Sequence, residues 1–294
     1  MAVPEHFFPC RVAAASPLSP HLVRLVLTGP GLAGFESTGL PDEWVRLFPP
    51  RPGEQRLPMP RRDGAGWAWE GEQPEGRYYT VRDWDRGAGE LTIDVVSHAA
   101  GIVTSWAQWG PVGDEVVVSS PRGSFAAPVD ASWLWLVGDV TALPAIGRIV
   151  EQLPDGLPTR VLVEVPDATD QQPLVSRSGL DVTWVEHEPV HGEVSSLERV
   201  VRAAPWPQGR GYFWMAGEAG QMRGLRKYLR HELQLPTPSY DVMGYWRFDA
   251  ERWLRTYEAA KIDAQAIWAE GERRGQDTGE IWDRYEQALD RAGL

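Results

Sequence analysis

The segment RYYTVR at positions 77–82 carries residue types that could bind a flat, phosphorylated cofactor. Side chains of an extended strand alternate between two faces, so we expect Arg77 and Tyr79 on one face and Thr80 on the other. A guanidinium can neutralise a phosphate, and a tyrosine ring can cover a flat heterocycle. Arginine and tyrosine also alternate on many ordinary strands, so this segment alone leaves both interpretations open.

A second segment, HAAGIVTSWA, follows about twenty residues later and contains Gly101 and Thr104 in a G-x-x-T arrangement. We expect a helix near Val103–Gln108. The free N–H groups at a helix N-terminus bind a diphosphate well, because they carry partial positive charge. A threonine that only caps the helix, without a bound ligand, would produce the same sequence pattern.

Two further segments stand where a nucleotide would bind to a parallel sheet. GDVTALPAIGRIV at 138–150 follows an apolar run and opens a helix. Ligands of open α/β sheets bind at the carboxyl ends of strands, which places Thr141 close to a nucleotide. AGE at 216–218 precedes a helix whose basic residues begin with Arg223. Their charges could meet a cofactor phosphate or form a solvated helix face.

Two familiar letter patterns lack the context that their chemistry needs. G-x-G-x-x-G at Gly29–Gly34 runs into FESTGLPDEW, which offers no helix N-terminus to a pyrophosphate, so we expect a glycine-containing turn. H-E-x-x-H at His187–His191 contains Pro189, which would cost about 3 kcal/mol inside the helix that this zinc motif requires. We therefore expect a strand end that runs into a loop.

The order of strand and helix patterns predicts two folding units and a tail. Residues 1–127 alternate short β-type runs with turns rich in glycine and proline, which is typical of an antiparallel barrel. After Pro128, short apolar runs alternate with helical stretches, as in a parallel sheet that is buried on both faces. The stretch from Asp249 to Leu294 has aromatic residues at helical intervals, and we expect two helices there.

Local signals refine some of these elements. In LTIDVV at 91–96, apolar residues alternate with polar ones, as in a half-buried strand. Pro144 stands in the first turn of the helix that follows Thr141, and Ser195 with Glu198 three residues later reads as a capping box.

Composition excludes several classes of function. The 294 residues are 43% hydrophobic and carry a formal net charge of −12, which argues against nucleic acid as the main partner. Cys10 is the single cysteine, so neither an internal disulfide nor a cysteine-ligated iron–sulfur cluster or zinc site is possible. No apolar run approaches the roughly 18 residues of a membrane span, and the first ten residues do not resemble a signal peptide. We expect the cytoplasm.

Six segments, in this order and at these distances, resemble the siderophore-interacting proteins, a branch of the ferredoxin reductase-like flavoproteins. They are RYYTVR, DVVSHAAGIVTSWA, PRGSF, GDVTALPAIGRI, YFWMAGEAGQMRGLRKYLR and GYWR. The resemblance implies a six-stranded antiparallel FAD-binding barrel at 1–128, an α/β domain for NADH or NADPH with a parallel sheet at 129–248, and a helical extension at 249–294. The implied activity is the reduction of ferric siderophores.

The resemblance also implies roles for single residues. FAD would be held by Arg77, Tyr79, Thr80, Arg82, His98, Val103, Thr104, Thr141 and Trp246. We assign NAD(P)H binding to Gly138, Gly217, Glu218 and Arg223. Asp139 and Thr141 match a GDET-like turn near both cofactors and are the only candidate catalytic side chains, although Val140 stands where the family usually has an acidic residue.

Substrate binding needs local positive charge, because many ferric siderophores are anionic and the chain as a whole is acidic. We assign it to Arg46, Arg51, Arg56 and Arg247. The first three lie in a proline-rich stretch, which could instead be an ordinary surface loop without a role in binding. No protein-bound structural metal is expected.

Two alternatives remain open from the sequence. The chain could be a flavin reductase that serves an oxygenase or a carrier protein. It could also be a ferric-siderophore binding protein without redox activity, which Val140 would favour. The expected partner is a ferric siderophore, without nucleic acid or membrane insertion, and the expected state is a monomer. The sequence does not decide between NADH and NADPH.

Overall fold

The computed structural model describes residues 6–50, 57–64, 66–72, 74–96, 106–107, 111–176, 179–187 and 195–294. Its strands are β1 Phe7–Ser19, β2 Leu22–Thr28, β3 Trp44–Phe48, β4 Pro60–Asp63, β5 Gly66–Trp69, β6 Arg77–Asp85, β7 Glu90–Val96, β8 Glu115–Ser119, β9 Leu134–Asp139, β10 Thr159–Val165, β11 Leu180–Glu186, β12 Tyr212–Glu218 and β13 Tyr240–Trp246. Its α-helices are α2 Leu143–Glu151, α3 Leu197–Ala203, α4 Ala219–Lys227, α5 Ala250–Ala260, α6 Ala264–Arg273 and α7 Thr278–Arg291. Short turns of helix are η1 Pro30–Gly34, η2 Ala168–Asp170, η3 Tyr228–Glu232 and η4 Thr237–Ser239.

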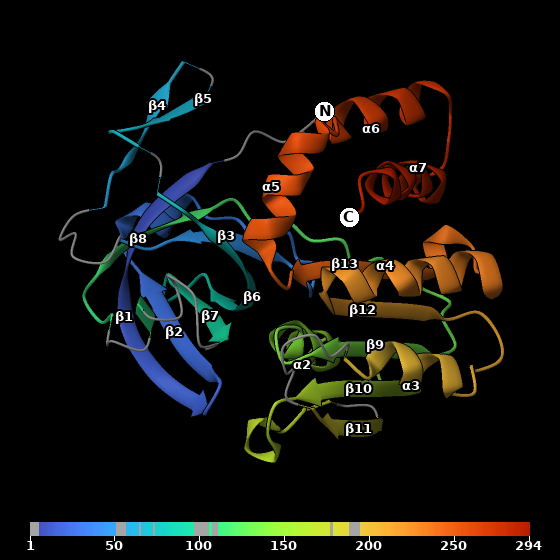
Figure 1. Cartoon of the computed structure of the whole chain (residues 1–294). Helices are drawn as coiled ribbons and strands as arrows, with labels where there is room; N and C mark the ends of the chain where they lie inside the picture. The colour runs from blue at the N-terminus through green and yellow to red at the C-terminus, as the bar shows by residue number, and fades with distance from the viewer. Residues whose placement is uncertain are drawn as a thin grey trace.

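The N-terminal strands form a closed antiparallel barrel in the order β1-β2-β7-β6-β3-β8, and β4 pairs with β5 in a separate hairpin (Figure 1). Leu91, Ile93 and Val95 of β7 point into the barrel core, so the predicted alternation is confirmed. Asp94 on the other face is 4% exposed. Arg24, its direct partner on β2, binds the Asp94 carboxylate through two nitrogens at 2.7 and 2.8 Å and so provides the hydrogen bonds that a buried carboxylate needs.

Cys10 lies in the same core with 7% of its surface exposed, and burial raises the pKa of its thiol to about 12. Only the thiolate attacks thiol reagents, so we expect native protein to react with Ellman's reagent at pH 8 far more slowly than unfolded protein. Absorbance of the released thiolate, with and without denaturant, measures this. Rapid reaction of the native protein would contradict the buried position.

The glycines at 29–34 form a turn, as expected. Gly29 has φ +144°, and a short 3-10 helix, η1, follows it. Gly31 lies against β1 so closely that a Cβ atom would stand 2.0 Å from the carbonyl oxygen of Pro9. The second pattern, at His187–His191, extends beyond His187 into residues outside the described part of the chain.

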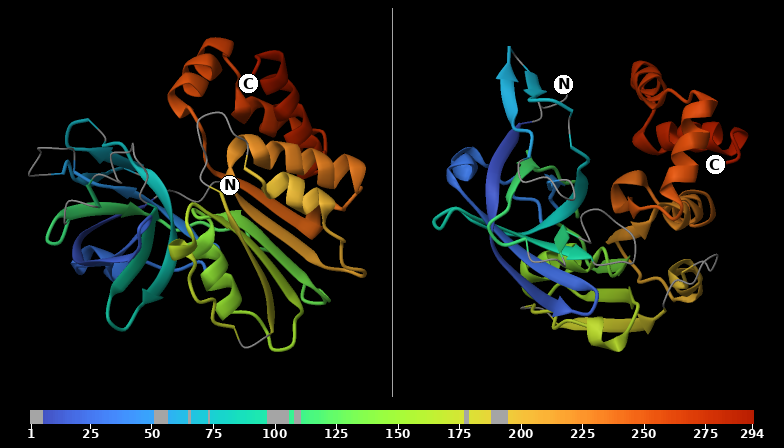
Figure 2. Two further views of the ribbon diagram at one scale, coloured as in Figure 1. Left: turned by 60° about the horizontal axis from the view of Figure 1, so that its bottom comes forward. Right: turned by 60° about the vertical axis from the view of Figure 1, so that its left-hand side comes forward.

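The second domain is a parallel sheet in the order β11-β10-β9-β12-β13. Every residue of β12 except its last is buried, and successive side chains enter two different cores: Tyr212, Trp214 and Ala216 on one face, Phe213 and Met215 on the other. Helix α2 covers the first face, whereas α3 and α4 cover the second (Figure 2). This explains why the strands lack alternation.

The capping box predicted at Ser195 and Glu198 is wrong. Helix α3 begins after Ser196, whose side chain makes no cap and instead donates to Glu164 at 2.8 Å. Glu198 bonds to Arg202 one turn later. Burial of Glu164, at 4% exposure, explains the change, because a buried carboxylate needs nearby donors.

The C-terminal extension contains three helices, so the prediction of two is wrong. Helices α6 and α7 pack together around Gly271, where a Cβ atom would stand 2.4 Å from a side-chain carbon of Ile281. Helix α5 comes directly after β13 and has no buried residue. It lies between the barrel and the other two tail helices (Figures 1 and 2).

Arg148 on α2 joins the two domains. It is 7% exposed, and its guanidinium donates to the carbonyl of Val81 at 2.7 Å and to the carboxylate of Glu43 at 2.9 Å. The domain boundaries at 128/129 and 248/249 stay predictions. Within the described residues, none of the helices has the length and apolar character of a membrane span.

Candidate functional site

Asp139 organises the carboxyl ends of the central strands. It ends β9, and one of its oxygens accepts from the backbone N–H and the hydroxyl of Thr141, at 2.8 and 2.5 Å. The other oxygen accepts from the indole N–H of Trp246, at the end of β13, at 2.7 Å. Burial raises the pKa of Asp139, and the hydrogen bonds from Thr141 and Trp246 oppose the rise. Trp246, which the sequence suggested separately from Asp139 and Thr141, therefore joins them in one cluster.

The predicted glycines make this cluster compact. A Cβ atom at Gly217 would stand 2.7 Å from a carboxylate oxygen of Asp139. A Cβ atom at Gly138 would stand 2.3 Å from that of Ala142, at the start of α2. Both positions thus exclude a side chain for packing reasons, and their role in NAD(P)H binding stays a prediction.

Val140, where the family usually has an acidic residue, is 9% exposed and belongs to the apolar core of the sheet domain. An apolar side chain suits this environment. The backbone turn between Asp139 and Thr141 nevertheless forms, because the Asp139 carboxylate bonds to the Thr141 N–H.

Glu218 caps helix α4. One carboxylate oxygen accepts from the N–H groups of Gly220 and Gln221 at 2.7 and 3.1 Å, and the other accepts from the N–H of Phe248 at 3.2 Å. The carboxylate thereby satisfies the first donors of the helix and ties α4 to the chain after β13. This is a structural role, and nucleotide binding by Glu218 stays a prediction.

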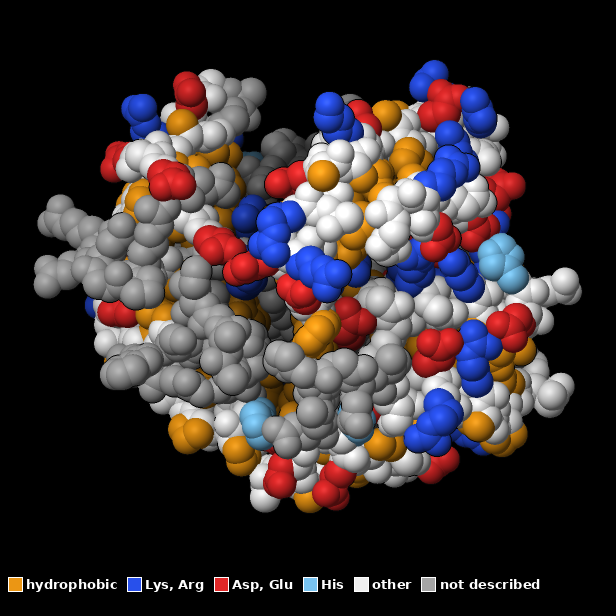
Figure 3. Space-filling model, in the orientation of Figure 1, with side chains coloured by type: hydrophobic (Ala, Val, Ile, Leu, Met, Phe, Trp, Pro, Cys, Tyr) orange, Lys and Arg blue, Asp and Glu red, His pale blue; other side chains and the backbone are white. Residues whose placement is uncertain are grey.

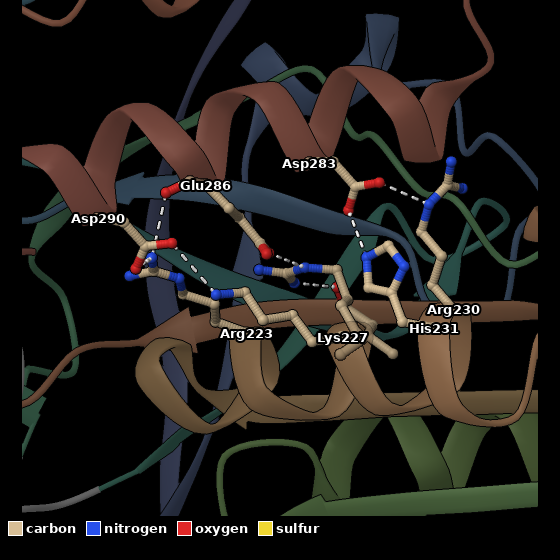
Figure 4. Close-up of polar contacts among 9 residues, drawn as sticks. Arg223, Lys227, Arg230, His231, Asp283, Glu286 and Asp290 are labelled. Carbon is tan, nitrogen blue, oxygen red and sulfur yellow. Dashed lines mark hydrogen bonds and ion pairs between the residues drawn. The ribbon is translucent and has the colours of Figure 1, made fainter.

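Arg223 of α4 contacts the C-terminal helix α7. Its guanidinium binds the Asp290 carboxylate and the backbone carbonyl of Glu286, both in α7 (Figure 4). It also donates to the backbone oxygen of Leu294. Its side chain is 17% exposed, so it is not on a solvated helix face, and α7 already supplies its anionic partner. The structure therefore shows Arg223 in contact with the C-terminal helix, and its role toward an NAD(P)H phosphate stays a prediction.

The rest of this surface follows the same pattern. Arg226 binds Glu286 at 3.0 Å, Lys227 binds Asp290 at 3.3 Å, and Arg230 binds Asp283 at 2.7 Å. Arg226 also lies over the ring of Trp282, with 4.5 Å from the guanidinium carbon to the centroid. Acidic residues along α7 thus each face a basic residue of α4 or η3 (Figure 4).

These contacts should differ greatly in energy. Glu286 is 3% exposed, so E286A leaves the Arg226 guanidinium unpaired and should weaken the docking of α7 by about 3 kcal/mol. The side chain of Asp290 is 54% exposed, and D290A should cost about 1 kcal/mol or less. Hydrogen exchange of the α7 amides measures both. Equal loss of protection in the two variants would contradict this ranking.

Strand β6 presents Arg77 and Tyr79 on one face and Thr80 on the other, as predicted, because Tyr79 is paired with Val45 of the barrel core. The Tyr79 ring packs against that core, and burial raises its pKa. Arg77 is exposed and binds Glu75. FAD binding by these residues stays a prediction.

Arg82 bonds to Glu151 of α2 through two nitrogens, at 2.8 and 2.5 Å. The ion pair links β6 to the sheet domain and satisfies the guanidinium without a ligand. The structure therefore gives Arg82 an interdomain role, and its diphosphate role stays a prediction. His98, Val103 and Thr104, assigned to the same diphosphate, lie outside the described residues.

Of the four arginines assigned to substrate binding, two lie within the described residues and two lie outside them. Arg51 and Arg56 lie outside the described residues. Arg46 is on β3 and contacts aromatic rings. Arg247 lies over the ring of Trp253 of α5 at 4.2 Å, and burial lowers its pKa against the effect of Glu218. In the space-filling view, the surface is hollowed between the lobe with the β4–β5 hairpin and the lobe with the C-terminal helices (Figure 3).

The barrel meets the carboxyl edge of the sheet at Thr80 and Tyr245. Burial raises the pKa of the Tyr245 phenol and Asp42 adds to the rise, whereas the nearby Thr80 hydroxyl lowers it. The Tyr245 hydroxyl is buried and has no hydrogen-bond partner within the described residues. An unsatisfied hydroxyl near Thr80 fits a flavin, whose ring edge carries hydrogen-bonding atoms.

Comparison with known proteins decides the family. A model for the siderophore-interacting FAD-binding domain matches residues 11–125, and a model for siderophore-interacting protein matches residues 131–249. An uncharacterised protein of Mycobacterium tuberculosis is 30% identical over 90% of this chain and 98% of its own length. The chain belongs to the siderophore-interacting protein family.

Other family members carry descriptive names. The ferric vibriobactin reductase of Vibrio cholerae is 29% identical over 78% of this chain and 85% of its own. The NADPH-dependent ferric-chelate reductase of Escherichia coli is 29% identical over 83% and 86%, respectively. The solved structure of a siderophore utilization protein from T. fusca has a TM-score of 0.71 at 29% identity, covering 84% of this chain and 95% of its own.

The fold is shared more widely. A ferredoxin reductase of carbazole 1,9a-dioxygenase superposes with a TM-score of 0.60 at 14% identity, covering 84% of this chain and 71% of its own. The predicted ferredoxin reductase-like architecture of a siderophore-interacting protein is therefore confirmed.

Sequence reasoning missed one exposed aromatic position on the outer face of the barrel, Tyr78. Tyr78, between Arg77 and Tyr79, is 60% exposed, and its ring meets that of Trp44 edge to face at 4.9 Å. The alternation of strand residues could have indicated it, because Tyr78 is two residues from Thr80 and therefore lies on the same face of β6.

Proposed function

We propose that this protein reduces ferric siderophores, with FAD on the barrel and NADH or NADPH as the source of electrons. The observation that supports it is the meeting of Thr80 on the barrel with Tyr245, Trp246 and Asp139 at the carboxyl edge of the sheet. A flavin held by the barrel and a nicotinamide held by the sheet would meet at this edge. The names of the two reductases in the family agree with this activity.

When bound, FAD supplies the ability to accept two electrons as a hydride and to release them one at a time. One nicotinamide then reduces two ferric ions to ferrous ions and yields one proton. Hard oxygen donors hold Fe(II) much less tightly than Fe(III), so reduction releases the metal. No acid or base side chain is needed for this step.

The protein's own residues orient the reacting groups. Asp139 fixes Thr141 and Trp246 where the two domains meet. Thr80 and the Tyr245 hydroxyl would bond to polar atoms of a flat ring at this seam. Arg46 and Arg247, with Arg51 and Arg56, supply positive charge for an anionic complex.

Anaerobic reduction of the purified protein tests this function. We expect yellow protein that bleaches with NADH or NADPH and recovers its colour when a ferric complex is added, with a ferrous chelator reporting Fe(II). Colourless protein that does not take up FAD would overturn the proposal. Recovery with ferredoxin or an oxygenase, but not with iron, would identify a flavin reductase instead. The cytoplasmic location and the monomeric state stay predictions.

A further inference from the structure

Arg46 lies between two aromatic rings on the outer face of β3 and β6. Its guanidinium carbon is 4.8 Å from the ring centroid of Phe48 and 5.8 Å from that of Tyr78. The register opposes Arg46 to Tyr78 and Trp44 to Thr80, so these four residues share one face of the barrel. This face continues toward Tyr245 at the seam between the domains.

The position of Arg46 depends on Gly76. A Cβ atom at Gly76 would stand 2.6 Å from Phe48 and 2.9 Å from the Arg46 Nε. That Nε is buried and has no hydrogen-bond partner within the described part of the chain. The absence of a side chain at Gly76 therefore leaves room for the Arg46 guanidinium over the ring of Phe48.

Arg46 differs from three other arginines of the barrel and of α2. Arg24, Arg82 and Arg148 each bind a carboxylate at 2.5–2.9 Å. Among the described residues, no carboxylate forms an ion pair with Arg46. A cation left without a carboxylate, in a chain with net charge −12, attracts an anion from outside.

Tyr78 adds a flat surface beside this charge. It is 60% exposed and is held edge to face by Trp44. It stands two residues from Thr80 on the same strand face, which is about 7 Å along the strand. A ligand that rests on Tyr78 and touches Arg46 would therefore lie next to the seam where the electrons arrive.

We propose that Arg46 and Tyr78 form a recognition site for an aromatic, oxygen-bearing ligand of iron, so that the protein favours ferric catecholates over ferric hydroxamates. A catecholate ring stacks on tyrosine, and its oxygens face the guanidinium. Ferric tris-catecholates carry negative charge, whereas ferric tris-hydroxamates are neutral. This inference rests on the proposed function and names the substrate class for it.

Binding to the oxidised holoenzyme tests the site independently of catalysis. Quenching of flavin or tryptophan fluorescence measures the Kd of ferric 2,3-dihydroxybenzoate and of ferric acetohydroxamate. We expect R46Q to raise the ratio of the catecholate Kd to the hydroxamate Kd about tenfold, and Y78L to raise it severalfold. R210Q is the matched control, because Arg210 makes an exposed ion pair with Asp130, and its ratio should equal that of the wild type.

Three results would overturn the proposal: equal weakening of both complexes in R46Q, an unchanged ratio in both variants, or loss of FAD from R46Q, which would assign Arg46 to the cofactor. The absorbance of released flavin detects loss of FAD. The thermal unfolding midpoint of each variant shows whether it is folded, and if one variant is misfolded, the Kd ratio of the other tests the proposal. Wild-type protein that binds catecholate selectively but reduces no iron would overturn the proposed function and leave this site standing.

Discussion

Replacement of Arg148 by methionine is expected to lower the free energy of unfolding by about 3–5 kcal/mol. Arg148 is 7% exposed and Glu43 is fully buried, so the variant leaves a carboxylate in the interior without its cation. It also removes the donor to the Val81 carbonyl. Glu43 keeps hydrogen bonds from Ser37 and Thr38, which limits the loss but does not supply positive charge. Urea denaturation followed by tryptophan fluorescence measures the change.

The matched control is R210M, because the side chains of Arg210 and Asp130 are 66% and 65% exposed. Such a pair contributes about 1 kcal/mol at most, since water screens it. The double variant E43Q/R148M removes the buried charge as well and should recover part of the lost stability. If R148M and R210M shift the denaturation midpoint equally, the Arg148 contact does not hold the domains together.

The sheet and most barrel strands were predictable because their burial leaves a direct trace in the sequence. β12 is apolar throughout, since both of its faces enter a core, and β7 alternates because only one face does. β1 leaves a weaker trace. Its sequence, FFPCRVAAASPLS, contains two prolines and a run of small residues, and shifts of register toward β2 interrupt its alternation. Pairing with two neighbours, rather than local preference, makes it a strand.

Capping boxes cannot be predicted with certainty from the local sequence alone. Ser195 and Glu198 have the right letters, but the buried Glu164 binds Ser196 in the folded chain. The pattern that does form a capping box is Asp277 with Glu280, at the start of α7. Both have the required spacing, so the difference comes from a tertiary contact that the local sequence does not contain.

The candidate site was predictable where the fold alone brings residues together. Asp139, Thr141 and Trp246 meet because the carboxyl ends of parallel strands share one edge. The environment of Arg223 depends on a helix about sixty residues later. The acidic residues Asp283, Glu286 and Asp290 do recur at helical spacing, but nothing in the sequence says which basic surface they face.

Replacement of Asp139 by asparagine is expected to slow the reduction of bound flavin by NADH or NADPH about 100-fold, because small displacements of reacting groups have effects of this size. The Asp139 carboxylate acts only as an acceptor, and it accepts from the Thr141 N–H, the Thr141 hydroxyl and the Trp246 indole N–H. An asparagine NH₂ group would face one of these donors, so the isosteric change should release Trp246 or the Thr141 turn. Anaerobic stopped-flow absorbance measures the rate.

W246F separates the two sides of the cluster, because it removes only the indole donor and leaves Asp139 bound to Thr141. We expect a smaller loss of rate than in D139N, since the turn after β9 stays in place. The Asp139 carboxylate also packs closely against Gly217, where a Cβ atom would stand 2.7 Å from it. If D139N reduces its flavin as fast as the wild type, the carboxylate does not position the nicotinamide, and the electron path must avoid this edge of the sheet.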